Sequence, residues 1–129
     1  MNPDIEKFLA SQAFAVAGAS KDHNKYGNKV LRCYLTHKMK VFPVNPHEKI
    51  LEGIPCINQI SDLPSEVNSL SIVTPPSVTE NIVEEAIKKG IKNIWMQPGA
   101  ESDAAIQNCK KNHINVIAGG SCILVTLGC

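Results

Sequence analysis

Ala13-Phe14-Ala15-Val16-Ala17-Gly18-Ala19-Ser20 is the stretch of this sequence that says most about its architecture. Its first five residues have the length and apolar composition of a buried strand, and Gly18 ends that strand. A glycine lets a phosphate come close to the backbone, where amide N–H groups can point at its oxygens. Ser20 adds a hydroxyl donor. The tripeptide Gly18-Ala19-Ser20 also occurs in ordinary tight turns, but its place directly after a first strand favours phosphate binding.

Apolar runs alternate with helical stretches along the rest of the chain. Further strands are expected at Val41–Val44, Leu70–Val73, Lys92–Met96 and Asn115–Ala118, and helices at Asp4–Ala10, Lys25–Lys38, Val78–Lys89 and from Ser102 to about Asn112. This alternation predicts a parallel sheet with helices on both faces. The expected fold class is α/β, a Rossmann-like three-layer sandwich with a five-stranded, mainly parallel sheet in a single domain over residues 1–129.

Two stretches lack a clear period. Lys49–Pro64 is broken by glycine and proline, so we expect an irregular connection with one short helix around Ile60. Ser121–Leu127 is expected to add a short extended segment.

The composition narrows the class of protein. Hydrophobic residues make up 43% and charged residues 19% of 129, which is typical of a soluble globular chain. The net charge of +1 gives no reason to expect a nucleic-acid partner. No apolar run approaches the roughly 20 residues that a membrane span needs, and Met1–Lys7 does not resemble a signal peptide. We therefore expect a cytoplasmic protein without a membrane partner.

The cysteines and histidines suggest neither disulfides nor metal. The five cysteines are Cys33, Cys56, Cys109, Cys122 and Cys129. Their odd number and the absence of a C-x-x-C pair favour free thiols in a reducing compartment. The four histidines show no ligand spacing with one another or with cysteine, so no metal site is expected.

The expected strand ends carry the candidate binding residues. Parallel strands place their carboxyl ends on one edge of a sheet, and ligands bind there where the strand order reverses. Lys25 would bring a positive charge to the first turn, and Gly27 would allow a helix to pack closely on a strand. The paired prolines Pro75 and Pro76 would form a stiff apolar wall or simply start a helix. The residues expected to bind a nucleotide cofactor are Gly18, Ala19, Ser20, Lys25, Gly27, Asn45, Pro46, Thr74, Pro75, Pro76, Gln97 and Pro98.

A nicotinamide cofactor fits this pattern less well. The G-x-G-x-x-G fingerprint is absent, and the second strand ends in Val44-Asn45-Pro46 without the acid that would hold ribose hydroxyls. An NAD(P)-binding oxidoreductase is therefore kept only as an alternative.

The ordered series of motifs resembles a known family. Val16-Ala17-Gly18-Ala19-Ser20, Lys25-Tyr26-Gly27, Pro43-Val44-Asn45-Pro46, Pro75-Pro76 and Trp95-Met96-Gln97-Pro98-Gly99 resemble the small stand-alone CoA-binding domain proteins. The fold of that family is similar to the N-terminal domain of the succinyl-CoA synthetase alpha subunit. The resemblance implies coenzyme A as the cofactor, held by the turns at Gly18, Asn45, Thr74 and Gln97. It implies no reaction.

One segment departs from the family. These small proteins usually follow the fifth strand with a Met-Asp-Arg-Cys-like stretch, whereas this chain has Gly119-Gly120-Ser121-Cys122. Cys122 is either a small buried residue or a thiol placed to form a mixed disulfide with the thiol of CoA.

The preferred function is the non-catalytic binding of CoA or acyl-CoA, because no nucleophile–base set is evident. A third hypothesis makes the chain the CoA-binding subunit of a multi-chain acyl-CoA ligase. Either a homo-oligomer or an unidentified protein partner is compatible with the sequence.

Overall fold

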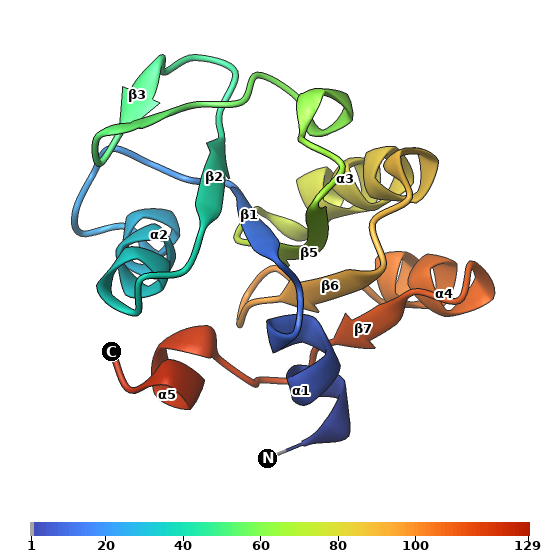
Figure 1. Ribbon diagram of the computed structural model, residues 1–129. Coiled ribbons are helices and arrows are strands. Elements are labelled where there is room, and N and C mark those ends of the chain that lie inside the picture. Colours follow the sequence, from blue (N-terminus) through green and yellow to red (C-terminus); the bar gives the residue numbers. More distant parts are fainter. Residues whose placement is uncertain (1) are drawn as a thin grey trace.

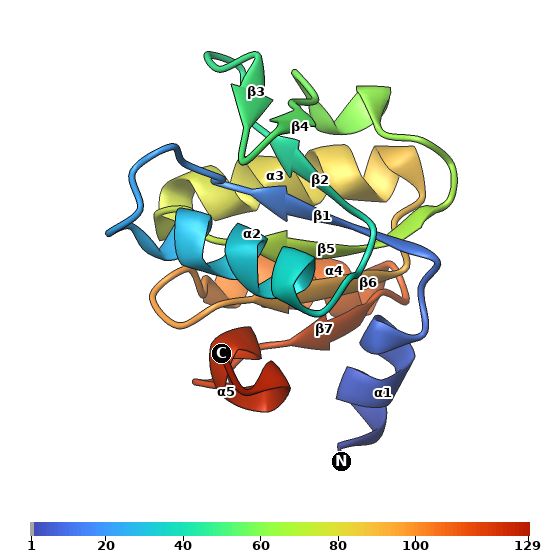
Figure 2. The same cartoon turned by 60° about the vertical axis from the view of Figure 1, so that its left-hand side comes forward.

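The computed structural model describes residues 2–129. It consists of a parallel sheet between two layers of helices (Figures 1 and 2). In chain order the elements are α1 (Pro3–Leu9), β1 (Ala13–Ala17), α2 (Tyr26–Thr36), β2 (Val41–Val44), β3 (Ile50–Leu51), β4 (Ile54–Pro55), the 3-10 helix η1 (Ile60–Asp62), β5 (Val67–Ile72), α3 (Pro76–Lys89), β6 (Asn93–Met96), α4 (Asp103–Lys111), β7 (Asn115–Ile117) and α5 (Ile123–Leu127). No helix within residues 2–129 is both long and apolar enough to cross a membrane.

The strand order of the main sheet is β2-β1-β5-β6-β7, and every neighbouring pair is parallel. The chain moves outward from β1 to β2 and then returns to the other side of β1 as β5. The order therefore reverses between β1 and β5, which is the point where open α/β sheets bind ligands. The predicted five-stranded, Rossmann-like α/β fold is confirmed.

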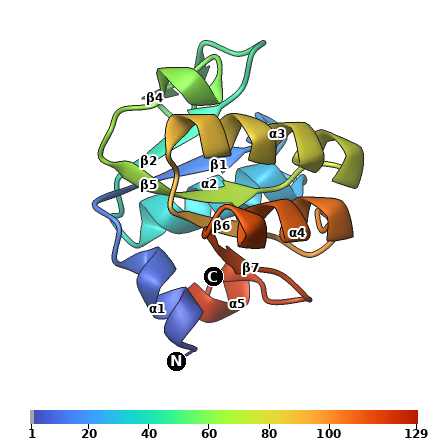
Figure 3. The same cartoon turned by 90° about the vertical axis from the view of Figure 1, so that its right-hand side faces the viewer.

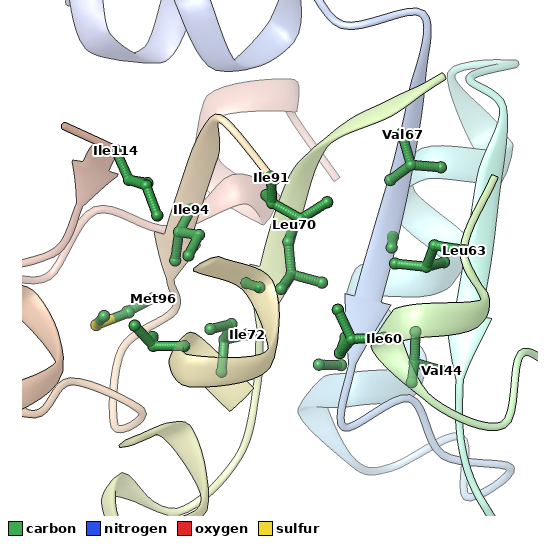
Figure 4. Packing of buried hydrophobic residues seen from close by; sticks show 14 of the residues in the cluster. Val44, Ile60, Leu63, Val67, Leu70, Ile72, Ile91, Ile94, Met96 and Ile114 are labelled. Atoms are coloured by element: carbon green, nitrogen blue, oxygen red, sulfur yellow. The ribbon is translucent and has the colours of Figure 1, made fainter. Parts of the chain in front are cut away.

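Each face of the sheet has its own core. Helices α1, α2 and α5 cover one face, where Phe8, Phe14, Tyr34 and Trp95 are buried together. Helices α3 and α4 cover the other face (Figure 3). The core on that side is aliphatic: side chains of neighbouring strands such as Leu70 and Ile94 gather there, and residues of η1 and its C-terminal cap close its end (Figure 4).

Strand β5 begins three residues before the expected Leu70, at Val67. The expectation stopped short because the extra residues are mostly polar. The hydroxyl of Ser69 is buried and donates to the carbonyl oxygen of Phe8 at 2.6 Å, and the hydroxyls of Ser71 and Tyr34 lie 2.7 Å apart. These small polar side chains let the helices sit close to the strand while their hydrogen bonds remain satisfied.

The tail is helical, so the expected extended segment at Ser121–Leu127 is wrong. The backbone amide of Ile123 donates to Oε1 of Gln97 at 2.9 Å, which gives the first turn of α5 a partner. Gly128 then ends the helix in the left-handed conformation, at φ 73°. The irregular stretch before β5 holds η1 as expected, together with the short β3–β4 hairpin.

Cys33 and Cys129 form a disulfide, with their Cα atoms 5.9 Å apart. The expectation of free thiols is therefore wrong for these two residues, whereas Cys56, Cys109 and Cys122 are free. The physical reason is the folding of the tail: α5 packs against α2, so residues 96 positions apart in the chain become neighbours.

Candidate functional site

A cavity of about 870 Å³ opens at the carboxyl ends of β1, β2 and β5, where the strand order reverses. This volume lies in the upper part of the range usual for small-molecule sites. The lining residues are Ala17, Gly18, Ala19, Ser20, Lys25, Tyr26, Gly27, Val44, Asn45, Pro46, His47, Asn58, Gln59, Ile60, Val73, Thr74, Pro75, Val78, Ile82 and Glu85. The structure thus brings together the first, second and third of the expected strand-end turns.

Two glycines shape the floor of the cavity. Gly18 has φ +93°, and a Cβ at this position would overlap the backbone carbonyl of Val73, the residue that follows β5. A Cβ at Gly27 would overlap the carbonyl oxygen of Gly18. The first turn of α2 therefore rests directly on the turn after β1, which confirms the expected packing role of Gly27.

The amino end of α2 faces this turn. Its N-cap residue, Lys25, makes no capping hydrogen bond through its side chain, and the first turn contains no acidic residue. Helix amino ends leave backbone N–H groups unpaired and carry a partial positive charge, so this end suits an anion. Lys25 is exposed and takes part in none of the ion pairs between described residues. Its ammonium is therefore available to the same anion.

Asn45 orders the second turn. Its side-chain amide donates to the carbonyl oxygen of Ala19 at 3.0 Å, which ties the end of β2 to the turn after β1. Its Oδ1 accepts from the backbone amides of His47 and Glu48, at 2.7 and 3.1 Å. Pro46 and His47 are held at the rim by these bonds, and both are exposed.

The opposite wall is formed by the turn after β5 and by α3. Thr74 and Pro75 line the cavity, and Val78 and Ile82 extend the wall along the helix. The hydroxyls of Thr74 and Thr79 lie 2.8 Å apart, which fixes the turn against the helix. Apolar atoms dominate this wall, so it suits an aromatic ring or an aliphatic chain better than a charged group.

Three of the expected site residues lie outside the cavity lining. Pro76 is the first residue of α3, with its ring exposed beside the wall. Gln97 directly follows β6 and its side chain is fully buried, and Pro98 comes next. The structure therefore places the fourth strand-end turn beside the site.

Tyr26 connects that turn to the cavity. Its hydroxyl contacts the sulfur of Cys122 and lies 3.5 Å from Oε1 of Gln97. Burial raises the pKa of Tyr26, and its hydrogen bond with Cys122 raises it further. The phenol therefore stays protonated at neutral pH and can donate a hydrogen bond, but it cannot act as a base.

Several lining residues carried no signal in the sequence. Tyr26 belonged to a quoted motif but was not predicted to bind. The segment that contains Asn58 and Gln59 reaches the cavity because Ile57 exchanges backbone hydrogen bonds with the end of β2, where its amide donates to Pro43 and its carbonyl accepts from Asn45. No residue type or spacing in the sequence predicts such a contact.

The family model described as "CoA binding domain" matches residues 12–128. Among curated proteins, the alpha subunit of an ADP-forming acetate–CoA ligase II from Pyrococcus furiosus is 30% identical over 91 residues, which is 70% of this chain and 20% of that one. An ADP-forming acetate–CoA ligase from Methanocaldococcus jannaschii is 31% identical over 81 residues, or 63% of this chain and 12% of the relative. The chain thus spans only a small part of the curated relatives it matches.

Solved structures give the same picture. A conserved hypothetical protein from Pyrococcus furiosus superposes with a TM-score of 0.85 at 36% identity, covering 89% of this chain and 98% of that one. A dinucleotide-forming acetyl-coenzyme A synthetase 1 from Candidatus Korarchaeum cryptofilum, in complex with phosphate and ADP, gives a TM-score of 0.79 at 28% identity. That match covers 88% of this chain and 27% of the synthetase.

Proposed function

The chain belongs to the CoA-binding domain family, and from this premise we propose that it binds coenzyme A or acyl-CoA in the cavity at the ends of β1, β2 and β5 without catalysing a reaction. The observation that carries the proposal is the close stacking of Gly27 on Gly18, which sets the amino end of α2 against an open turn. Such an arrangement suits a diphosphate.

The first turn, the apolar wall and the rim of the cavity each suit a different part of the CoA molecule. The diphosphate would lie between the Gly18-Ala19-Ser20 turn and Lys25, where backbone amides and an ammonium group converge. The apolar wall of Pro75, Val78 and Ile82 would receive the adenine ring or the pantetheine arm. At the rim, His47 is suited to a phosphorylated ribose.

A non-catalytic role fits the titratable groups of the lining. Tyr26 is held protonated, and neither His47 nor Glu85 has a hydrogen-bonded side-chain partner that could make it part of a nucleophile–base pair within residues 2–129. The protein would then hold or present the thioester rather than cleave it.

A second candidate is the CoA-binding subunit of a multi-chain acyl-CoA ligase. It is favoured by the relative from Pyrococcus furiosus that is named as a subunit alpha of an acetate–CoA ligase. A partner chain would then supply the rest of the ligase.

Calorimetric titration with CoA, acetyl-CoA, NAD and NADP tests the ligand. We expect CoA and acetyl-CoA to bind more tightly than either nicotinamide dinucleotide. Tighter binding of NAD would contradict the proposal. Incubation with acetyl-CoA, followed by a colorimetric assay for free thiol, tests the absence of chemistry. Thiol release above the rate without protein would show an enzyme instead.

Lys88→Ala offers a matched control for the site itself. This lysine lies in the last turn of α3 and outside the cavity lining. Its removal changes the net charge as Lys25→Ala does, so a loss of affinity confined to Lys25→Ala would locate the diphosphate at the first turn.

A further inference from the structure

Cys33, His37 and Cys129 form a cluster of side chains that lies outside the cavity lining. Cys33 is buried in α2, whereas His37, the C-cap of that helix, and Cys129 are exposed. Their ligand atoms, two sulfurs and one imidazole nitrogen, all lie within 4.8 Å of one another. We propose that this cluster binds a zinc-class divalent metal ion when the Cys33–Cys129 disulfide is reduced.

The spacing of the three residues suits a metal ion. Cys33 and His37 are four positions apart, so they project from the same side of a helix. In tetrahedral zinc sites, Zn–S bonds of about 2.3 Å place two sulfurs roughly 3.7 Å apart. The two sulfurs, which are joined in the disulfide, must therefore move apart on reduction, and the imidazole nitrogen, which lies within 4.8 Å of both, must approach them. Rotation of the exposed His37 and Cys129 side chains can supply both movements.

The ligand chemistry is selective for the same class of ion. Thiolate and imidazole are the ligands that zinc prefers in proteins, and calcium and magnesium require oxygen ligands. Three protein ligands leave a fourth position for water. The carboxyl end of α2 also carries a partial negative charge, which favours a cation beside His37.

The disulfide and the metal site exclude each other. A disulfide sulfur cannot act as a thiolate ligand, so the ion binds only after a reductant, such as a thiol or a phosphine, supplies two electrons and the two sulfurs take up two protons. Binding of the ion then releases the two thiol protons to solvent, leaving two thiolates on the metal. Reduction followed by metal binding would thus replace the disulfide between α2 and the tail with a link through the metal ion.

The sequence predicts no metal site, because the histidines show no ligand spacing with one another or with cysteine. The fold nevertheless places His37 beside Cys33 and Cys129. The third ligand becomes a neighbour only through the docking of α5 on α2.

Cobalt titration of the full, tag-free chain tests the proposal. Co²⁺ reports thiolate ligation by an intense sulfur-to-metal absorption band in the near ultraviolet. We expect one Co²⁺ per chain in the protein reduced with a phosphine, displacement of that band by one equivalent of Zn²⁺, and no band in the oxidised protein. Absence of the band in the reduced protein would overturn the proposal.

Matched variants identify the ligands. Cys129→Ser should remove about half of the band intensity and weaken Co²⁺ binding at least tenfold, whereas Cys56→Ser should change neither. His37→Asn should weaken binding about tenfold, while His113→Asn, at an exposed position with φ 59°, should not. Circular dichroism of each variant checks that it folds. A band that survives in Cys129→Ser but disappears in Cys56→Ser would place the metal elsewhere and refute the site.

Discussion

Gly18→Ala, compared with Gly99→Ala, isolates the close approach on which the binding turn depends. The two glycines have nearly the same positive φ, +93° and +94°. A Cβ at Gly99 would meet no atom within 4 Å, whereas a Cβ at Gly18 would overlap the backbone carbonyl of Val73. The difference between the two variants therefore measures the overlap alone.

The magnitude follows from these two contributions. The left-handed conformation costs an alanine about 1–2 kcal/mol at either site. Overpacking adds about 1–3 kcal/mol at Gly18 only. The neighbouring carbonyl cannot give way easily, because the amide of the same residue, Val73, donates to Ala17 at 2.8 Å in the strand pairing. At roughly 3–5 °C per kcal/mol for a domain of this size, Gly18→Ala should melt about 3–15 °C below Gly99→Ala.

Urea unfolding followed by tryptophan fluorescence gives the free energies. Trp95 is the single tryptophan of the chain and is fully buried, so its emission reports the folded core. Calorimetry with CoA should show an unchanged affinity for Gly99→Ala and at least a tenfold loss for Gly18→Ala, because the turn must shift. Unfolding free energies that agree within about 0.5 kcal/mol would refute the close-approach argument.

Lys25→Ala should weaken CoA binding by up to roughly tenfold at low salt and by much less at high salt, because salt screens exposed charges; calorimetry at two ionic strengths checks this, and equal losses would contradict it. Tyr34→Phe should cost about 1–3 kcal/mol in urea unfolding because it leaves the buried hydroxyl of Ser71 without a partner, and Ser71→Ala in the same chain should recover most of that cost. The pKa of Glu52 is lowered, first by a hydrogen bond from Asn28, so its contribution to stability is complete above the ordinary pKa of 4.5 and is lost as pH falls through the lowered folded value. Glu52→Gln should therefore make the melting temperature fall less steeply with pH on the acid side. An unchanged pH profile would show that this carboxylate does not contribute to the acid dependence of stability.

Most elements could be predicted because their local pattern agrees with their tertiary role. β1 and β2 have the expected bounds, and α3 differs by two residues because Pro76 can begin a helix. The early start of β5 and the helical tail were not predicted, and both have the same cause. Ser69 on β5 and Ile123 on α5 adopt their conformation through partners distant in the chain, Phe8 and Gln97. Local propensity contains no information about such partners.

The residues of the candidate site likewise fall into those that the sequence predicts and those that only the fold brings to the cavity. Gly18 and Lys25 could be proposed from the sequence, because a glycine directly after an apolar first strand favours phosphate binding and a nearby lysine adds a positive charge. The segment at Asn58 and Gln59 could not, because its place at the cavity depends on a backbone bridge between Val44 and Ile57. The disulfide escaped prediction for the same reason, since it depends on how the tail docks.

The position of Gln97 argues for a positioning role toward the binding site. Its Oε1 accepts from the amide of Ile123 and lies near the hydroxyl of Tyr26, so the side chain links α5 to a residue that lines the cavity. Its Nε2 is the one buried side-chain nitrogen or oxygen in residues 2–129 without a partner. Turning the amide over would set two N–H donors against each other at Ile123, so the orientation is determined by α5. A buried donor without a partner costs about 1–3 kcal/mol, and the hydrogen bond that Oε1 accepts from Ile123 opposes the rotation that could relieve this cost. The turn after β6 is therefore connected to the proposed binding cavity through Tyr26, and its own residues do not line that cavity.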